Sequence, residues 1–137
     1  MLFRSDNIYG GSGNDTINGG EGDDQLVGGY GADVLTGKQG QDVFRYLDTR
    51  DTGDSITDFN VREDKIDFSG IDANIATAGN DSFQLVSGMQ LQANSVNWFV
   101  ENGNTVIQID TDGNTATAEF ELTLVGTLQL DSVNFVL

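Results

Sequence analysis

The chain has 137 residues, of which 22 are acidic and 6 basic, so its net charge is −16, and it has 18 glycines but no histidine, cysteine or proline. Without histidine or cysteine, Ser-His-Asp and Cys-His catalysis, the usual zinc sites, iron–sulfur clusters and disulfide bonds are excluded. The negative charge also excludes nucleic acid as a partner, because the chain cannot replace phosphate counterions. It favours cations as ligands.

The start of the chain and its hydropathy bear on localisation. The first six residues, from Met1 to Asp6, contain no apolar segment. We therefore expect no cleavable signal peptide there. No run of 18 apolar residues occurs anywhere, so we expect no membrane span.

Residues 6–45 repeat with a period of nine. Four copies begin at Gly10, Gly19, Gly28 and Gly37, and glycine recurs at position four of each copy. Aspartate recurs at positions 6, 15, 24, 33 and 42, and a large apolar residue at 8, 17, 26, 35 and 44. A flexible glycine-rich linker has no reason to keep two chemically different positions in phase. The period therefore predicts an ordered repeat.

The residue types suggest how each repeat folds. Glycines at positions one, two and four permit positive φ, so six residues can form a tight turn. The turn would aim backbone carbonyls and the aspartate carboxylate inward, and such hard oxygen ligands suit Ca²⁺. The last three residues would form a short strand whose apolar centre points into the core.

Each turn reverses the chain, so successive strands are expected on opposite sheets. The structural period is then 18 residues, which stacks Ile8, Leu26 and Phe44 on one side and Ile17 and Leu35 on the other. Turns that are two repeats apart become neighbours. The predicted carboxylate pairs are Asp6/Asp24, Asp15/Asp33 and Asp24/Asp42, with calcium between the turns. A repeat of this kind is typical of calcium-binding parallel β-helices.

We predict calcium as the cofactor, with about three or more ions, because flexible oxygen cages of this kind suit Ca²⁺. The ligands are expected to be side chains or turn carbonyls of Asp6, Gly10, Ser12, Gly13, Asn14, Asp15, Gly19, Glu21, Gly22, Asp23, Asp24, Gly28, Tyr30, Gly31, Ala32, Asp33, Gly37, Gln39, Gly40 and Asp42. Asp58 and Asp64 either bind a further calcium at the end of the repeats or are two solvated loop carboxylates. Because facing carboxylates repel, we expect residues 6–45 to be disordered or loose without calcium.

The remainder of the chain is predicted to be rich in strands. Short alternating segments occur at 56–59, 65–68, 96–100, 105–109 and 119–125. Asn102-Gly103 and Asp112-Gly113 are strong signals for two-residue hairpins. Residues 71–76 suggest a short helical turn. We expect one sheet that is continuous with the repeats.

Residues 110–114, Asp-Thr-Asp-Gly-Asn, permit two interpretations. The pattern resembles a calcium loop, and the full helix–loop–helix signature needs a later glutamate, for which Glu121 is close but has a sheet-like context. The simpler interpretation is an Asp-Gly hairpin turn, which the pattern favours. Paired carboxylates also suggest glycoside hydrolysis, but the repeat register already accounts for the aspartates.

The motif GGxGxD, followed by x, a large apolar residue and x, resembles the RTX (repeats-in-toxin) family. Residues 41–46, 53–59, 63–69, 109–114 and 119–126 resemble the serralysin-type C-terminal domain of that family. The resemblance implies an all-β fold. A calcium-binding parallel β-roll would occupy residues 1–46, and an antiparallel β-sandwich-like cap would occupy residues 47–137. One departure is Lys38, which stands where the motif has glycine.

The resemblance also implies a location and partners. It implies export by a type I ABC exporter, an extracellular or cell-surface location, and an upstream domain in the parent protein. Residues 128–137 end in an apolar tail after Asp131, which resembles the C-terminal signal of such exporters or forms an ordinary final strand.

The function predicted on this basis is a non-catalytic C-terminal module that folds on calcium after export. The alternatives are a carbohydrate-binding repeat module, as in alginate epimerases, or the terminal domain of an adhesin. Tyr30, Tyr46, Trp98 and Phe99 are the candidate contacts for a polysaccharide.

Overall fold

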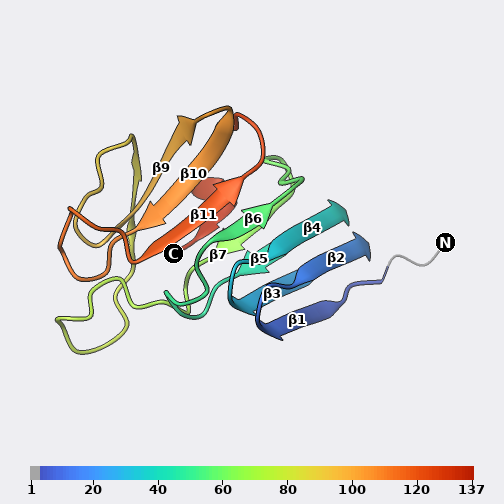
Figure 1. Ribbon diagram of the computed structural model, residues 1–137, viewed down its shortest axis with the longest axis horizontal. Helices are drawn as coiled ribbons and strands as arrows, with labels where there is room; N and C mark the ends of the chain where they lie inside the picture. Colours follow the sequence, from blue (N-terminus) through green and yellow to red (C-terminus); the bar gives the residue numbers. More distant parts are fainter. Residues whose placement is uncertain (1–3) are drawn as a thin grey trace.

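The computed structural model describes residues 4–137, which form twelve strands and one short 3₁₀ helix (Figure 1). The strands are β1 Asn7–Ser12, β2 Thr16–Glu21, β3 Gln25–Tyr30, β4 Val34–Gln39, β5 Val43–Arg45, β6 Asp54–Ile56, β7 Lys65–Asp67, β8 Gln84–Ser87, β9 Ser95–Glu101, β10 Asn104–Ile109, β11 Phe120–Leu124 and β12 Phe135–Val136. The 3₁₀ helix η1, Ser132–Asn134, precedes β12. No helix among residues 4–137 is long and apolar enough to cross a membrane.

The first seven strands alternate between two sheets and form a parallel β-roll. One sheet has the order β1-β3-β5-β7-β12, and the other begins β2-β4-β6. Ile8 pairs with Leu26 and Leu26 with Phe44, whereas Ile17 pairs with Leu35. The expected 18-residue structural period and the stacking of the apolar residues are therefore confirmed.

The division of each repeat into turn and strand differs from the prediction. β1 to β4 have six residues each, because the first three residues of every repeat continue the strand. Positive φ occurs at positions two and four, as at Gly11 (108°) and Gly13 (109°), but not at the position-one glycines. Those glycines are required for close approach: a Cβ at Gly10 would lie 2.5 Å from the Gly28 carbonyl oxygen.

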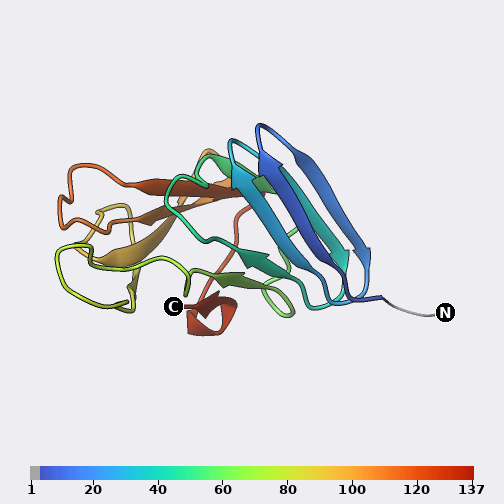
Figure 2. The same cartoon turned by 90° about the horizontal axis from the view of Figure 1, so that it is seen from below.

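The second sheet continues from the roll into the C-terminal part of the chain. Its full order is β2-β4-β6-β11-β10-β9-β8, in which β11 pairs parallel to β6 and antiparallel to β10. On the other sheet β12 pairs parallel to β7. The two sheets form two facing layers when the molecule is viewed from below (Figure 2). The expected continuity of roll and cap is confirmed.

One hydrophobic core lies between the two layers. Leu26, Leu35 and Phe44 are fully buried in the roll, and the same cluster continues to Leu122 in the cap. Tyr46 belongs to this core too, with its ring centroid 5.0 Å from that of Phe120. The proposal of Tyr46 as a saccharide contact is therefore wrong, because the side chain is inside.

One of three local predictions for the cap is confirmed and two are wrong. Asn102-Gly103 turns the hairpin between β9 and β10, with φ of 52° and 81°, as expected. Asp112-Gly113 instead lies within the longer connection between β10 and β11, which begins after Ile109 pairs with Phe120. Residues 71–76 form bends and a turn and no helix.

Candidate calcium sites

The repeat aspartates form two ladders, one along each edge of the roll where the turns lie. One ladder contains Asp6, Asp24, Asp42 and Asp64, and the other contains Asp15, Asp33 and Asp54. The Oδ1 atom of each later aspartate accepts the backbone N–H of the aspartate before it, over 2.7 to 3.0 Å. The three predicted carboxylate pairs are thus neighbours in the fold.

In five of the ladder aspartates, the second carboxylate oxygen has no hydrogen-bond partner among residues 4–137. These buried atoms are the Oδ2 atoms of Asp15, Asp24, Asp33, Asp42 and Asp54. A carboxylate oxygen that is buried without a donor loses its hydration and gains nothing in return. A row of such oxygens therefore calls for a cation.

The gaps around these atoms are lined by further oxygens. A Cβ atom built on Gly19 would lie 2.6 Å from Asp24 Oδ2 and 2.9 Å from the carbonyl oxygen of Gly37. A Cβ atom built on Gly28 would lie 2.3 Å from Asp33 Oδ2 and 3.0 Å from Asp54 Oδ2. Carboxylate and carbonyl oxygens from adjacent turns thus converge over the first glycine of a repeat. An all-oxygen donor set of this kind fits Ca²⁺.

Burial and mutual repulsion act on several of these carboxyl groups. Burial raises the pKa of Asp54 to about 7, and the charge of Asp33 adds to the rise. Burial likewise raises the pKa of Asp64 to about 6. The pKa of Asp42 is raised by burial and by its ladder neighbour Asp24. The structure therefore opposes ionisation of these carboxylates when no cation neutralises them.

These pKa shifts predict how calcium-stripped protein responds to pH. An aspartate with a folded pKa near 6 or 7 and an unfolded pKa of about 3.9 binds its proton more tightly when folded. The stabilisation is complete below about pH 4 and is lost as the pH rises through 6 to 7. Calcium-stripped protein should therefore retain more β-sheet, measured by circular dichroism, at pH 5 than at pH 7.5. Asp54→Asn should weaken this dependence, and a larger β-sheet signal at pH 7.5 would contradict the assignment.

Other predicted ligand residues hold neighbouring turns together. At position five, Asn14 Oδ1 accepts the N–H of Ala32, and Asp23 Oδ1 accepts the N–H of Gln41. At position three, the carbonyl oxygen of Tyr30 accepts the N–H of Gly13 at 2.8 Å. The other predicted ligand residues lie in the same turns or in the second halves of the strands before them, namely Gly10, Ser12, Glu21, Gly22, Gly31, Gly37, Gln39 and Gly40. Their role as ligands stays a prediction.

Asp58 and Asp64 lie at the end of one ladder. Asp64 is buried, and its two oxygens accept the N–H groups of Asp42 (3.0 Å) and Asn60 (2.8 Å). It is therefore not a solvated loop carboxylate. Asp58 is exposed, and its oxygens accept the N–H groups of Gly37 (2.9 Å) and Lys38 (2.8 Å). The Asp58 carboxylate thus binds the last repeat turn directly.

Asp54 is a ladder residue that was not among the predicted ligands. It follows Asp33 by 21 residues, so it falls outside the strict period of the repeats. A local pattern could have identified Asp54. As in the repeats, it lies two residues before a buried apolar residue, Ile56. Asp54 also lies near Tyr46, and burial together with this carboxylate raises the pKa of Tyr46 well above its usual range.

Lys38 occupies a position-two site with φ of 75°. Left-handed backbone costs a residue with a Cβ about 1 kcal/mol relative to glycine. Lys38→Gly should therefore stabilise the calcium-loaded protein by about 1 kcal/mol, measured by thermal melting. Lys38→Ala is the control, because alanine keeps the Cβ and should bring no such gain. Equal stabilisation by both variants would assign the effect to the lysine charge instead of the backbone.

Comparison with known proteins agrees with the repeat. Residues 9–44 match the family described as the RTX calcium-binding nonapeptide repeat, in four copies. No curated protein matches the chain. Among solved structures, the AlgE6R3 subunit of a mannuronan C5-epimerase from Azotobacter vinelandii is similar, with 26% identity and a TM-score of 0.48 over 96% of this chain and 77% of that chain. The AlgE6R2 subunit from the same organism has 21% identity and a TM-score of 0.46, over 97% of this chain and 92% of that chain. Residues 9–44 are therefore an array of RTX calcium-binding nonapeptide repeats, folded as a parallel β-roll.

Proposed function

We propose that this chain is a non-catalytic C-terminal module of a larger secreted protein, and that it folds on calcium after export by a type I ABC exporter. The observation that carries the proposal is the row of buried ladder oxygens without partners. These oxygens make the folded roll unfavourable without a cation and favourable with one. About three or more calcium ions would be held between the ladder turns, where they would supply positive charge.

The proposal links this property to export. A cytosol with little free calcium would leave the roll unfolded, and an exporter that threads an unfolded chain needs that state. Millimolar calcium outside the cell is comparable with the dissociation constants of extracellular calcium modules, about 10⁻⁴–10⁻³ M. The roll would then fold outside and prevent the chain from sliding back.

The last residues are the proposed export signal. Residues 66–137 contain no lysine or arginine, and four of the five residues from Val133 to Leu137 are apolar. In the folded chain, Asp131 caps η1, and within residues 4–137 β12 pairs with β7 alone. This end is short and peripheral, which suits a signal that is read before the chain folds.

Secretion of a fused passenger tests the signal. Deleting residues 131–137 should abolish secretion through a matching type I exporter. The triple variant Asp15→Asn, Asp24→Asn and Asp33→Asn should instead be secreted more slowly, because it folds poorly outside. Circular dichroism of the purified deletion variant in calcium separates loss of the signal from loss of β12. Normal secretion of the deletion variant would overturn the assignment of this tail.

We also propose that an upstream domain continues the roll. β1 and β2 are the edge strands of the two sheets at the N-terminal end (Figure 1). Among the strands of residues 4–137, neither has a neighbour on its outer side, and such edges are suited to further pairing, so an upstream repeat could add to both. If the chain is instead the terminal domain of an adhesin, only the function of the upstream domain differs from this proposal.

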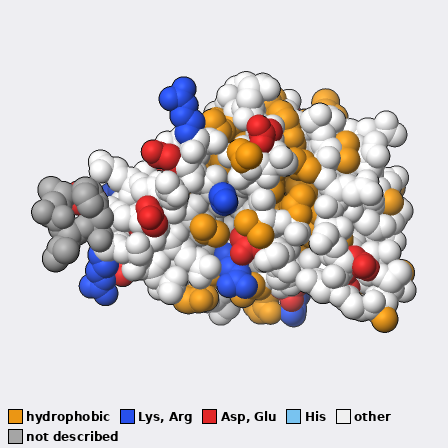
Figure 3. Space-filling view, turned by 180° about the vertical axis from the view of Figure 1, so that it is seen from behind, with side chains coloured by type: hydrophobic (Ala, Val, Ile, Leu, Met, Phe, Trp, Pro, Cys, Tyr) orange, Lys and Arg blue, Asp and Glu red, His pale blue; other side chains and the backbone are white. Residues whose placement is uncertain are grey.

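Polysaccharide binding is the second candidate. Hydrophobic side chains with a few basic ones among them gather across the middle of one face (Figure 3). A groove of about 250 Å³ is lined by Val27, Tyr30 and Leu47. The Arg50 guanidinium lies 4.6 Å from the centre of the Tyr30 ring and occupies one of its faces. A pull-down on alginate and on a neutral glucan, with and without calcium, tests this candidate. Retention that is lost in Tyr30→Ala would support it.

A further inference from the structure

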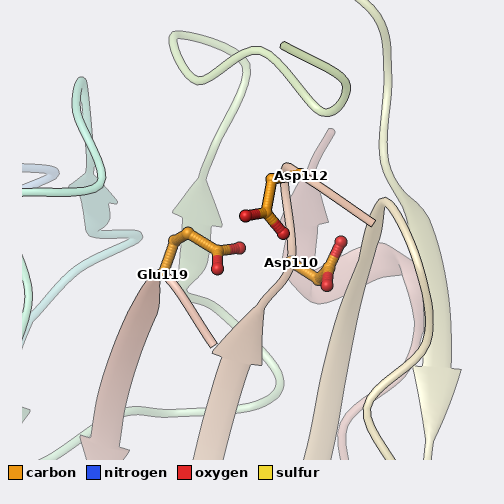
Figure 4. Close-up of side chains that lie close together, drawn as sticks. All are labelled: Asp110, Asp112 and Glu119. Carbon is orange, nitrogen blue, oxygen red and sulfur yellow. The ribbon is translucent and has the colours of Figure 1, made fainter. Parts of the chain in front are cut away.

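A second group of carboxylates lies in the cap, away from the roll. Asp110, Asp112 and Glu119 each place one oxygen within 4.8 Å of the others. They come from the connection between β10 and β11, and the Asp112 carboxylate lies between the other two (Figure 4). The antiparallel pairing of Ile109 with Phe120 brings the two ends of this connection together.

One oxygen of each carboxylate is already used by the loop. Asp110 Oδ1 accepts the N–H groups of Gly113 (2.8 Å) and Asn94 (2.9 Å). Asp112 Oδ1 accepts the N–H of Asn114, and Glu119 Oε2 accepts the N–H of Thr111, both at 2.8 Å. These bonds fix the orientation of all three side chains. They leave the second oxygen of each carboxylate available to a ligand.

The oxygen left over on Asp110 is the observation that separates this group from an ordinary acidic surface. The Asp110 side chain is fully buried, and its Oδ2 atom has no hydrogen-bond partner in the part of the chain that the structure describes. Buried carboxylate oxygens without a donor are costly unless a cation is present. The same signature marks the ladder aspartates in the roll.

No basic side chain compensates these charges. Residues 66–137 contain neither lysine nor arginine, and the ion pairs among residues 4–137 involve Asp6, Asp48 and Asp67 only. Three carboxylates that lie so close together repel one another. A divalent cation removes that repulsion, and a set of oxygen ligands open to water on the Asp112 side suits Ca²⁺.

We propose that Asp110, Asp112 and Glu119 form a calcium site that is separate from the roll. A cation there would hold the connection between β10 and β11 closed. It would also stabilise the contacts that this connection makes with neighbouring loops, where Ile75 N–H donates to the Thr111 carbonyl (3.1 Å) and Asn94 N–H donates to Asp110. The site stands without the proposed function, because it uses no residue of the roll.

Calcium stoichiometry tests this site. Equilibrium dialysis with ⁴⁵Ca²⁺ at saturating calcium would compare the full chain with the double variant Asp112→Asn and Glu119→Gln. Both replacements keep an acceptor oxygen for the Asn114 and Thr111 N–H groups and remove only charge, and buried Asp110 is left unchanged. The matched control is Glu101→Gln with Glu121→Gln, since both side chains are exposed on the same sheet outside the group.

The site variant should bind one calcium ion fewer per chain than the wild type, and the control should bind the same number as the wild type. Equal stoichiometry in all three proteins would overturn the site. Circular dichroism in calcium checks folding, and if the double variant fails to fold, Glu119→Gln alone is measured and should also lose one ion. Asp24→Asn alters the roll and leaves this site intact, so failure of the two sites is distinguishable.

Discussion

Removing calcium with EGTA should unfold the roll. Circular dichroism should lose much of the β-sheet signal, and millimolar Ca²⁺ should restore it cooperatively. At ten times its dissociation constant each ion contributes about 1.4 kcal/mol. Three ions then contribute roughly 4 kcal/mol, which is comparable with the whole stability of a small domain. The physical reason is the stack of buried oxygens on Asp15, Asp24, Asp33, Asp42 and Asp54.

Mg²⁺ is the control for this experiment. It demands a small octahedral shell and gives up its water reluctantly, so it should restore the spectrum poorly at the same concentration. NMR spectra would show where the change occurs. The backbone amide signals of Leu26 and Leu35, which lie in the roll, should lose their folded-state chemical shifts when calcium is removed. A spectrum and melting temperature that EGTA leaves unchanged would rule out calcium-dependent folding.

Asp24→Asn should be among the most damaging single changes in the ladders. Asp24 lies in the middle of its ladder: its Oδ1 accepts the Asp6 N–H, and its own N–H donates to Asp42 Oδ1. Asparagine keeps the acceptor but loses the charge and the second carboxylate oxygen at two adjacent sites. Loss of two ions at about 1.4 kcal/mol each amounts to roughly 3 kcal/mol. The calcium concentration at the folding midpoint should rise accordingly, as followed by circular dichroism.

Two comparisons make the Asp24 result specific. Asp48→Asn changes a half-buried carboxylate that pairs with Arg50 at 2.6 Å outside the ladders, and it should leave the midpoint unchanged. In EGTA the difference between Asp24→Asn and the wild type should reverse. Asp24→Asn should retain at least as much β-sheet signal as the wild type, because one of the stacked charges is gone. Equal midpoints for Asp24→Asn and Asp48→Asn would refute the register of the ladders.

The sequence predicts the roll well because the aspartates of the ladders and the apolar residues of the core recur with the same period. Each aspartate and each apolar residue recurs every nine residues, and both must return to the same place for the ladder and the core to stack. Ile17 opposite Leu35 and Asp15 beside Asp33 follow from that coincidence. Proximity of these residues could therefore be deduced without coordinates.

Where the period ends, the local signals are weaker. Asp54 was missed because the loop before it adds three residues to the 18-residue period, although its contact with Asp33 is the same as in the repeats. Asp112-Gly113 was taken for a tight hairpin because dipeptide preference carries no information about the long-range contacts of Asp110. Asp110 is buried, and its Oδ1 accepts the N–H of Asn94, which lies 16 residues away in sequence.

Successive strands of the roll alternate between two sheets. Whether the number of repeats is odd or even therefore determines which sheet the upstream chain joins. β6 and β7 anchor the roll to β11 and β12, so these two attachments fix which sheet each earlier strand must join. Loss of a single nine-residue unit near the N-terminus would leave both attachments intact and transfer everything upstream to the opposite layer. Loss or gain of two units keeps the layer and moves the upstream chain by one strand spacing, about 4.8 Å. Duplication in pairs therefore adjusts the reach of whatever precedes the module, whereas a single duplication reverses the side from which it emerges.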